Sequence, residues 1–175
     1  VLGSAHVGLR NFVQSTEAYN EALKISKERG DGNATAGYLS SIALNHEYLN
    51  KHDKAMEFHE SSLKIYRELK NDRKIAITLN SLGGSYEMNG RQGAAKLFKE
   101  ALEISRGLGR KDLTVSNLNA IGLGFYKKGE LEKAEKIFLE ALELYQETKK
   151  YSGVALMNNT LGGINSFWGQ YDKAL

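Results

Sequence analysis

The sequence contains no cysteine and no proline among its 175 residues. Without cysteine the chain cannot form disulfides, thiolate metal sites or a cysteine nucleophile, and such a composition is typical of a cytoplasmic protein. Without proline, every turn has to be made by other residue types. We expect the 18 glycines, together with Asn and Asp, to make the turns.

Long apolar runs and a strong charge imbalance are missing as well. No run approaches the roughly 18 to 20 apolar residues that a membrane-spanning helix needs, so we expect no membrane contact. A net charge of +3 is too small to indicate nucleic-acid binding by itself. No basic segment followed by an apolar one opens the chain, but the first residue is Val1, so its targeting stays open.

A short motif returns at a fixed interval along the whole chain. It occurs as Ala22-Leu23-Lys24, Ser62-Leu63-Lys64, Ala101-Leu102-Glu103 and Ala141-Leu142-Glu143. The steps from leucine to leucine are 40, 39 and 40 residues. Such self-similarity is typical of solenoid proteins, in which each unit buries its apolar face by stacking on its neighbours. We therefore expect tandem copies of one module and no enzyme.

Residues 115–145 show the module most clearly. Apolar residues recur at helical spacing from Leu118 to Phe125, and the sequence Lys128-Gly129-Glu130 then interrupts the pattern. The pattern resumes from Leu131 to Leu144. Because glycine can take the left-handed conformation that closes a helix, Gly129 favours a tight turn. The module is predicted to be an antiparallel helical hairpin.

Aligning the copies places residues of similar size at the same positions. A large aliphatic residue recurs at Leu2, Ile42, Leu82, Ile121 and Leu161, and a small one follows it at Gly3, Ala43, Gly83, Gly122 and Gly162. The second helix has two further small positions: Ser15, Ala55, Ala94, Ala134 and Ala174, then Ala22, Ser62, Ala101 and Ala141. Glycine inside a helix lowers its stability relative to alanine. Small residues in register therefore indicate helices that cross closely.

Two copies carry the full pattern that the chain shares with a known family. Leu82-Gly83, Tyr86, Gly90, Ala94, Phe98 and Ala101 resemble the signature of the tetratricopeptide repeat, as do Ile121-Gly122, Phe125, Gly129, Ala134, Phe138 and Ala141. The common unit has about 34 residues and carries a proline near its end. The longer, proline-free unit is similar to the variety found in Pins-type adaptors, kinesin light chains and bacterial Rap-like regulators. The resemblance implies an all-α, right-handed superhelical solenoid of antiparallel helix pairs, with about four and a half repeats.

The module boundaries follow from this alignment. A single array over residues 1–175 is expected, with a partial repeat at 1–31, full repeats at 32–71, 72–111 and 112–150, and a partial repeat at 151–175. Because the chain begins and ends inside a module, we interpret it as a fragment of a longer array. Gly90 and Ala94 are one residue closer together than Gly129 and Ala134. We expect either a tighter turn or a second helix that starts late in that repeat.

The four histidines raise the possibility of a metal site. His6, His46, His52 and His59 align with packing aromatic or aliphatic residues of the other copies, which favours a structural role. No metal and no cofactor is expected, although an enzyme that uses these histidines stays an alternative that metal analysis would test. His46 and His59 are expected to weaken the packing of the second hairpin. The stretch 107–111 lacks the Gly-Lys-Ser/Thr ending of a phosphate loop and is predicted to be a turn.

A polar residue recurs two positions before the aliphatic one, at Ser40, Asn80, Asn119 and Asn159. Asparagine is a poor helix former, so its recurrence needs an explanation. The resemblance implies that this first-helix face lines a concave groove, where asparagine holds the backbone of a bound peptide through its donor and acceptor. A solvated face, or hydrogen bonds to a neighbouring helix, are the alternatives.

The same resemblance places further residues in the groove. They are Leu44, Glu47, Tyr48, Ile77, Glu87, Met88, Leu123, Tyr126, Lys127, Leu156 and Phe167, with Gly37, Gly84, Ser116, Gly163 and Ser166 between them. Leucine and glycine alternate from repeat to repeat, which would create spaced pockets for the side chains of a peptide. Lys127 is the one basic residue of this set, which argues against a clamp for a terminal carboxylate.

Basic residues gather near the second-helix ends, at Lys27, Arg29, Lys70, Arg73, Lys74, Arg106, Arg110, Lys111, Lys149 and Lys150. Cations near helix C-termini complement the helix dipole, and we favour this explanation. An acidic partner or RNA is a weaker alternative, because the aromatic residues that could stack on bases belong to the core.

The sequence thus predicts a non-catalytic protein-protein interaction module that binds an extended or helical segment of a partner in its concave groove. The alternative is a sensory or regulatory segment of a larger signalling protein, whose ligand is a signal peptide or an adjoining domain. End-to-end self-association is a further possibility, since Phe167, Trp168 and Leu175 would leave apolar ends uncovered.

Overall fold

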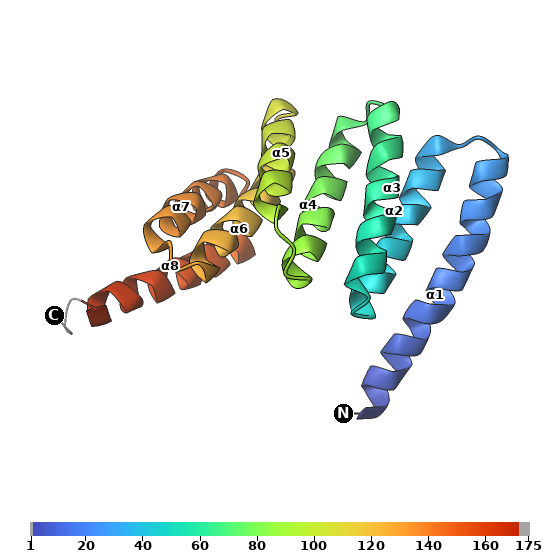
Figure 1. Ribbon diagram of the computed structural model, residues 1–175. Helices are drawn as coiled ribbons and strands as arrows, with labels where there is room; N and C mark the ends of the chain where they lie inside the picture. Colours follow the sequence, from blue (N-terminus) through green and yellow to red (C-terminus); the bar gives the residue numbers. More distant parts are fainter. Residues whose placement is uncertain (1, 172–175) are drawn as a thin grey trace. The chain divides into compact units, whose positions relative to one another are not determined.

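The computed structural model describes the backbone of residues 2–171 and the side chains of residues 11–166. Within residues 2–171 the chain forms eight α-helices and no strand (Figure 1). No helix of this part of the chain combines the length and the apolar character needed to cross a membrane. The helices are α1 (Leu2–Glu28), α2 (Gly32–Tyr48), α3 (His52–Glu68), α4 (Asp72–Met88), α5 (Ala94–Gly107), α6 (Lys111–Lys127), α7 (Leu131–Glu147) and α8 (Tyr151–Tyr171).

The chain divides into two compact units, residues 1–101 and residues 102–175. In unit 1, α2 packs against α1 and α3, and α3 packs against α4. In unit 2, α7 packs against α6 and α8. Successive helices run in opposite directions in each unit (Figure 1), so the predicted all-α architecture of antiparallel helix pairs is confirmed.

One residue in the left-handed conformation follows each of the helices α1 to α7. Inside the predicted hairpins these residues are Asn50, Gly90 and Gly129, with φ of 55°, 66° and 74°. Between hairpins they are Gly30, Lys70, Gly109 and Lys149. The backbone N–H after the left-handed residue bonds back into the helix, as Lys51 N–H does to the His46 carbonyl at 2.8 Å. Lys70 and Lys149 correct the expectation that Gly, Asn and Asp alone make the turns.

The first predicted hairpin does not form, because α1 is one continuous helix of 27 residues. Arg10 aligns with Asn50, Gly90 and Gly129, the residues at the turns of the other hairpins. At Arg10 the helix continues instead of turning. At the other end, α8 extends to Tyr171. The second helix expected around Ala174 and Leu175 lies outside the described residues.

The third repeat has the late second helix that the sequence predicted. Helix α5 begins at Ala94 and has 14 residues, whereas α3 and α7 begin three residues before the corresponding alanine and have 17 residues each. Gly93 precedes α5 with a φ of 109°. The missing residue in the loop is therefore absorbed by the first turn of the helix.

Most of the described positions that the alignment of the copies identified as packed are buried. Ala55, Ala101, Ala134 and Ala141 are all fully buried, and so is Ile42. A Cβ atom added at Gly83 would lie 2.5 Å from the ring of Phe98, and one added at Gly122 would lie 2.6 Å from the ring of Phe138. Glycine is thus required where an aromatic ring of the second helix lies directly on the backbone of the first.

Candidate functional site

The first helices of the hairpins present the face to which the sequence assigned the groove. In unit 1 this face belongs to α2 and α4. Three of its large apolar side chains are exposed to solvent: Leu44 at 41%, Tyr48 at 63% and Met88 at 68%. Ile77 and Glu87 are half-buried beside them. We call the predicted groove positions of these two helices the first-helix face of unit 1.

Unit 2 presents the corresponding face on α6 and α8. Leu123, Tyr126 and Leu156 are exposed at 46%, 48% and 53%, and Lys127 is exposed as well. The side chain of Phe167, also predicted for the groove, lies outside the described residues. These positions are called the first-helix face of unit 2.

Exposed apolar side chains are concentrated on these two faces. Among residues 11–166, twelve large hydrophobic side chains are exposed, and six of them are predicted groove residues. Scattered single hydrophobic residues are normal on a protein surface, whereas contiguous exposed apolar patches are typical of interaction surfaces. The groove residues were predicted from their positions in the repeat, so their exposure is an independent observation.

Each face carries a glycine at the repeat position that holds an exposed leucine in the preceding repeat. A Cβ atom added at Gly84 in unit 1, or at Gly163 in unit 2, would meet nothing within 4 Å. These glycines therefore do not serve close helix packing, unlike Gly83 and Gly122.

The four polar residues that recur two positions before the aliphatic one have different surroundings in the structure. Ser40 is half-buried, and its Oγ lies 2.8 Å from Oγ of Ser62 on α3. Ser62 donates its own proton to the Ala36 carbonyl at 2.8 Å, so Ser40 must be the donor to Ser62. Ser40 is thereby tied to the second helix of its own hairpin.

Asn119 is tied to its second helix in the same way. Its Nδ2 donates to the hydroxyl of Tyr145 at 3.2 Å, and its Oδ1 is buried without a hydrogen-bond partner. Asn80 is half-buried, and Asn159 is exposed on α8. Of the three asparagines, Asn159 therefore offers a peptide backbone the most accessible amide.

Glu47 belongs to a hydrogen-bonded cluster that links three helices of unit 1. Its carboxylate accepts hydrogen bonds from Ser85 on α4 and from His59 Nε2 on α3, the latter at 3.2 Å. Burial alone would raise the pKa of the Glu47 carboxyl, but the hydrogen bonds from His59 and Ser85 outweigh it and hold the pKa below its usual range. Glu47 therefore joins the two repeats, and a ligand would reach only its exposed quarter.

Two partners of groove residues escaped the sequence analysis. Ser85 is fully buried against Glu47, and Phe12 of α1 stacks on the ring of Tyr48 at 4.5 Å between centroids. Neither contact follows from the repeat pattern alone. The continuous α1 removes the predicted first turn, and the position of Phe12 depends on that helix. One side of the Tyr48 ring is thus already covered.

His46 and His59 occupy packing positions, as their alignment predicted, whereas the half-buried His52 lines a pocket. His46 stacks on Phe58 with 5.4 Å between ring centroids, and His59 is 1% exposed. The side chain of His6 lies outside the described residues. Among residues 11–166 no group of three or more His, Asp and Glu side chains could hold a metal ion. The structure also gives His46 and His59 different partners, so their effects on stability can be separated.

His46 should make stability depend on pH. Burial, followed by the charges of Lys54 and Lys51, lowers the pKa of its imidazole below the usual 6.5. The unfolded chain then binds the proton more readily than the folded chain, so stability is lost as the pH falls through 6.5 toward the lower folded pKa. The variant His46→Phe should keep the stack on Phe58, and its melting temperature should depend less on pH. The measurement is thermal unfolding followed by circular dichroism from about pH 7 to about pH 5.

Lys54→Met is the matched variant for this experiment. It removes one of the two positive charges near His46 but leaves the burial, so it should reduce the pH dependence only in part. If the melting temperatures of the wild type and His46→Phe fell equally with decreasing pH, another group would be the cause of the loss of stability.

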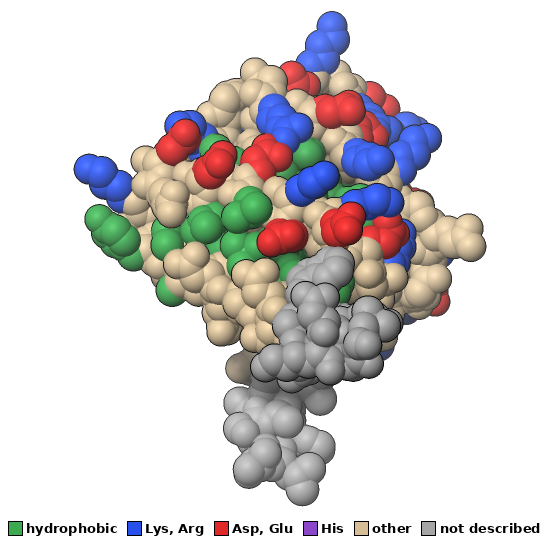
Figure 2. Space-filling model, turned by 90° about the vertical axis from the view of Figure 1, so that its left-hand side faces the viewer, with side chains coloured by type: hydrophobic (Ala, Val, Ile, Leu, Met, Phe, Trp, Pro, Cys, Tyr) green, Lys and Arg blue, Asp and Glu red, His purple; other side chains and the backbone are tan. Residues whose placement is uncertain are grey.

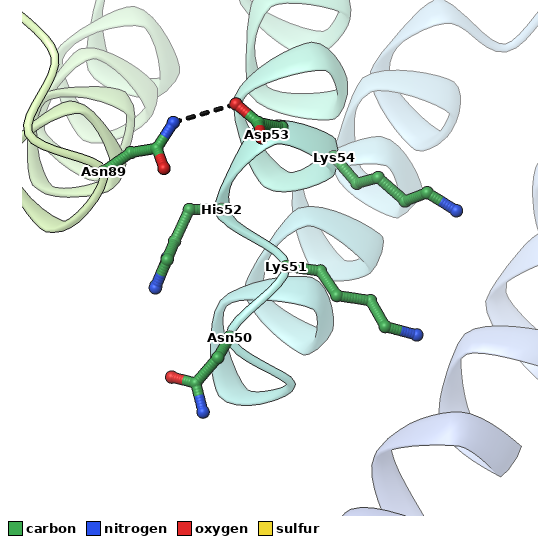
Figure 3. A pocket seen from close by; sticks show the side chains of 6 residues that line it. All are labelled: Asn50, Lys51, His52, Asp53, Lys54 and Asn89. Atoms are coloured by element: carbon green, nitrogen blue, oxygen red, sulfur yellow. Dashed lines mark hydrogen bonds between the residues drawn. The ribbon is translucent and has the colours of Figure 1, made fainter.

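A pocket of about 410 Å³ lies at the turn between α2 and α3, and none of its lining residues is a predicted groove residue. It is lined by Asn50, Lys51, His52, Asp53, Lys54 and Asn89. Asn89 donates to Asp53 at 2.8 Å, and the side chains of Lys51 and Lys54 point away from Asn89 (Figure 3). Since the charged groups do not converge on one point, the pocket does not have the arrangement of an anion or metal site.

Several residues of the predicted basic edge are paired with carboxylates. In unit 2, Arg106 pairs with Glu140, Lys111 lies 2.7 Å from Glu147, and Arg110 makes two hydrogen bonds to Asp112. Exposed pairs of this kind contribute little to stability. They do neutralise part of the edge, which weakens the case for an acidic partner there.

Comparison with known proteins places this geometry in a family. The tetratricopeptide repeat model matches residues 2–68, 74–147 and 113–175. The chain is 29% identical over 139 residues to response regulator aspartate phosphatase H of Bacillus subtilis, which covers 79% of this chain and 35% of that protein. The chain therefore spans about a third of the length of this relative.

Solved structures agree on the fold. A Rap protein complexed with competence and sporulation factor matches 98% of this chain and 48% of its own, with a TM-score of 0.75 and 21% identity. The TPR-like repeats of a kinesin light chain from Podosopora anserina match 98% of this chain and 87% of their own, with a TM-score of 0.74 and 14% identity. The helix pairs, the repeat period and the family match lead to one conclusion: the chain belongs to the tetratricopeptide repeat family.

Proposed function

We propose that the first-helix faces bind an extended or helical segment of a partner protein. The observation that carries the proposal is the grouping of exposed apolar side chains on these faces, since half of the large ones among residues 11–166 lie there. Exposed apolar side chains on the same face as Gly84 or Gly163, where an added Cβ atom would meet nothing within 4 Å, suit a ligand that buries some of its side chains and leaves others in solvent.

The charges around these faces narrow the kind of ligand. Lys127 is exposed in unit 2, while Glu47 in unit 1 is largely engaged by His59 and Ser85. Neither face carries the cluster of Lys and Arg that a terminal carboxylate or a phosphate would need. We therefore expect the ligand to be a predominantly apolar peptide segment. Because ordering a peptide costs entropy, we expect micromolar affinity for one short segment.

A regulatory role in signalling is the second candidate, and the relatives favour it. One relative is a response regulator aspartate phosphatase, and a Rap protein of the same fold has been solved in complex with competence and sporulation factor. In this role the bound segment would be a signal peptide or an adjoining domain. We propose that the chain itself is non-catalytic and works in the cytoplasm. The phosphatase activity in the relative's name is not proposed for this chain.

Asn159 gives the most selective test of the peptide-backbone contact. Its amide is exposed, so Asn159→Ala should leave the melting temperature unchanged and weaken peptide binding several-fold, by about 0.5 to 1.5 kcal/mol for one hydrogen bond. The probe is a peptide selected on the wild-type protein from a random phage-displayed library, with affinity measured by calorimetry.

Asn119→Ala is the informative companion variant. Because Asn119 donates to Tyr145, this change should affect stability as well as binding. Unchanged affinity after replacing Asn80, Asn119 and Asn159 together would exclude the asparagine contact with the peptide. It would leave the apolar part of the proposal to be judged separately.

A further inference from the structure

Tyr66 of α3 combines a buried ring with a hydroxyl that has no partner in the protein. The residue is 2% exposed, and within residues 11–166 its hydroxyl makes no hydrogen bond. The sealed polar atoms without a partner in this part of the chain are Nδ1 of three histidines and Oδ1 of Asn119. The Tyr66 hydroxyl is not among them, so it keeps contact with solvent.

Gly37 of α2 lies where this hydroxyl reaches the surface. A Cβ atom added at Gly37 would lie 3.7 Å from the Tyr66 hydroxyl. Gly37 is half-buried and belongs to the first-helix face of unit 1, as a predicted groove position. The other first helices carry a side chain at this position, namely Ile77, Ser116 and Leu156. The missing side chain at Gly37 therefore leaves the hydroxyl accessible from the first-helix face.

Tyr145 of α7 stands at the same repeat position as Tyr66 and shows what this hydroxyl can bind. In unit 2, Nδ2 of Asn119 donates to the Tyr145 hydroxyl at 3.2 Å. The residue of unit 1 that aligns with Asn119 is Ser40. Its single proton goes to Ser62 at 2.8 Å, so Ser40 cannot donate to Tyr66. The position that an amide occupies in unit 2 is thus open to a ligand in unit 1.

The surroundings of Tyr66 favour an uncharged ligand group. Burial raises the pKa of the Tyr66 hydroxyl, and no charge among the described residues adds to this shift. The net charge of the chain is only +3, and Lys and Arg lie interspersed with Asp and Glu on the side that Figure 2 shows. A neutral donor can bind a buried hydroxyl without the cost of desolvating an ion.

We propose that the Tyr66 hydroxyl accepts a hydrogen bond from an amide N–H of the bound partner segment, as the Tyr145 hydroxyl does from Asn119. This inference rests on the proposed function, because it places the segment on the first-helix face of unit 1. The peptide backbone and the side chains of Asn and Gln supply the same amide chemistry. The contact adds a polar recognition point to a face whose exposed side chains include Leu44 and Met88.

Tyr66→Phe removes the hydroxyl and keeps the ring. Because the hydroxyl has no partner in the protein, the melting temperature should stay unchanged. The affinity for a peptide bound to unit 1 should fall about three- to tenfold, as expected for one hydrogen bond. The probe is a library-selected peptide whose binding is abolished by Leu44→Asp with Met88→Asp, and calorimetry measures its affinity.

Tyr145→Phe is the matched control for this variant. It removes the same atom from the same repeat position, but the hydroxyl of Tyr145 is bonded to Asn119. The control should therefore lower the melting temperature and keep the affinity for a peptide that binds unit 1. The two variants separate a hydroxyl that binds the ligand from one that holds two helices together.

Changes in the peptide identify the amide that Tyr66 binds. Replacing the backbone amides one by one with esters removes one N–H at a time, and replacing Asn or Gln by Ala tests the side chains. One such change should weaken binding to the wild type several-fold and have no further effect on Tyr66→Phe. An ester position would assign the contact to the peptide backbone, and an Asn or Gln position to a side chain.

The outcomes distinguish this inference from the proposed function. Wild-type affinity of Tyr66→Phe would overturn the inference, while the loss caused by Leu44→Asp with Met88→Asp would still support the proposed function. A lower melting temperature of Tyr66→Phe with unchanged affinity would assign the hydroxyl a structural role and overturn the inference as well. If Leu44→Asp with Met88→Asp left the binding of every selected peptide intact, both proposals would fail for unit 1.

Discussion

Gly83→Ala should destabilise the protein by about 1 to 3 kcal/mol, the usual cost of forcing extra volume into a packed site. The added Cβ atom would lie 2.5 Å from the ring of Phe98, which is itself 3% exposed and has little room to move. Urea unfolding followed by circular dichroism measures the change in the free energy of unfolding. The same reasoning applies to Gly122, which meets Phe138 at 2.6 Å.

The adjacent Gly84 is the matched control for this prediction. It lies in the same helix, but an added Cβ atom would meet nothing within 4 Å. Gly84→Ala should therefore raise stability by about 0.5 to 1 kcal/mol, because alanine is the better helix former. If both variants changed stability in the same direction and by similar amounts, the ring contact would not be the reason for glycine at position 83.

The pair of substitutions Leu44→Asp and Met88→Asp should abolish peptide binding by unit 1 without unfolding it. Both side chains are exposed, so the folded protein loses little when they become polar. A bound peptide would instead have to bury two carboxylates against apolar side chains, and loss of central apolar contacts in interfaces costs about 2 kcal/mol or more each. Calorimetric titration with a library-selected peptide should show a loss of at least about a hundredfold.

Leu69→Asp with Leu108→Asp provides the control for that pair. These leucines are exposed to a similar degree, at 44% and 41%, but they lie just after the second helices α3 and α5. The control should bind the peptide as the wild type does. If both double variants lost the same amount of peptide affinity, the peptide would bind to exposed apolar residues in general and not to a specific site on the first-helix face.

The helix pairs could be predicted from the sequence because the repeat period and the glycine turns are local signals. Gly90 and Gly129 adopt the left-handed conformation expected of them, and the small residues in register mark the helix crossings. Arg10 stands where the other copies have Asn or Gly, but this difference alone could not predict the continuous α1. Lys70 and Lys149 take the left-handed conformation without such a signal.

The hydrogen bonds of the candidate site could not be predicted in the same way. Asn119 and Tyr145 are 26 residues apart, and Glu47 and Ser85 are 38 residues apart. Whether such groups meet depends on the separation and rotation of helices, which the repeat alignment does not specify. The face on which each residue lies could be predicted from the alignment. The hydrogen bond from Asn119 to Tyr145, and the greater exposure of Asn159, are visible only in the structure.

The most direct test of the central claim is an NMR experiment on the protein with specifically labelled leucine and methionine methyl groups and the library-selected peptide. Binding at the first-helix faces predicts intermolecular NOEs from the peptide to the methyl groups of Leu44, Met88, Leu123 and Leu156. NOEs confined to the exposed leucines elsewhere would contradict the account, and these are Leu69, Leu108 and Leu139.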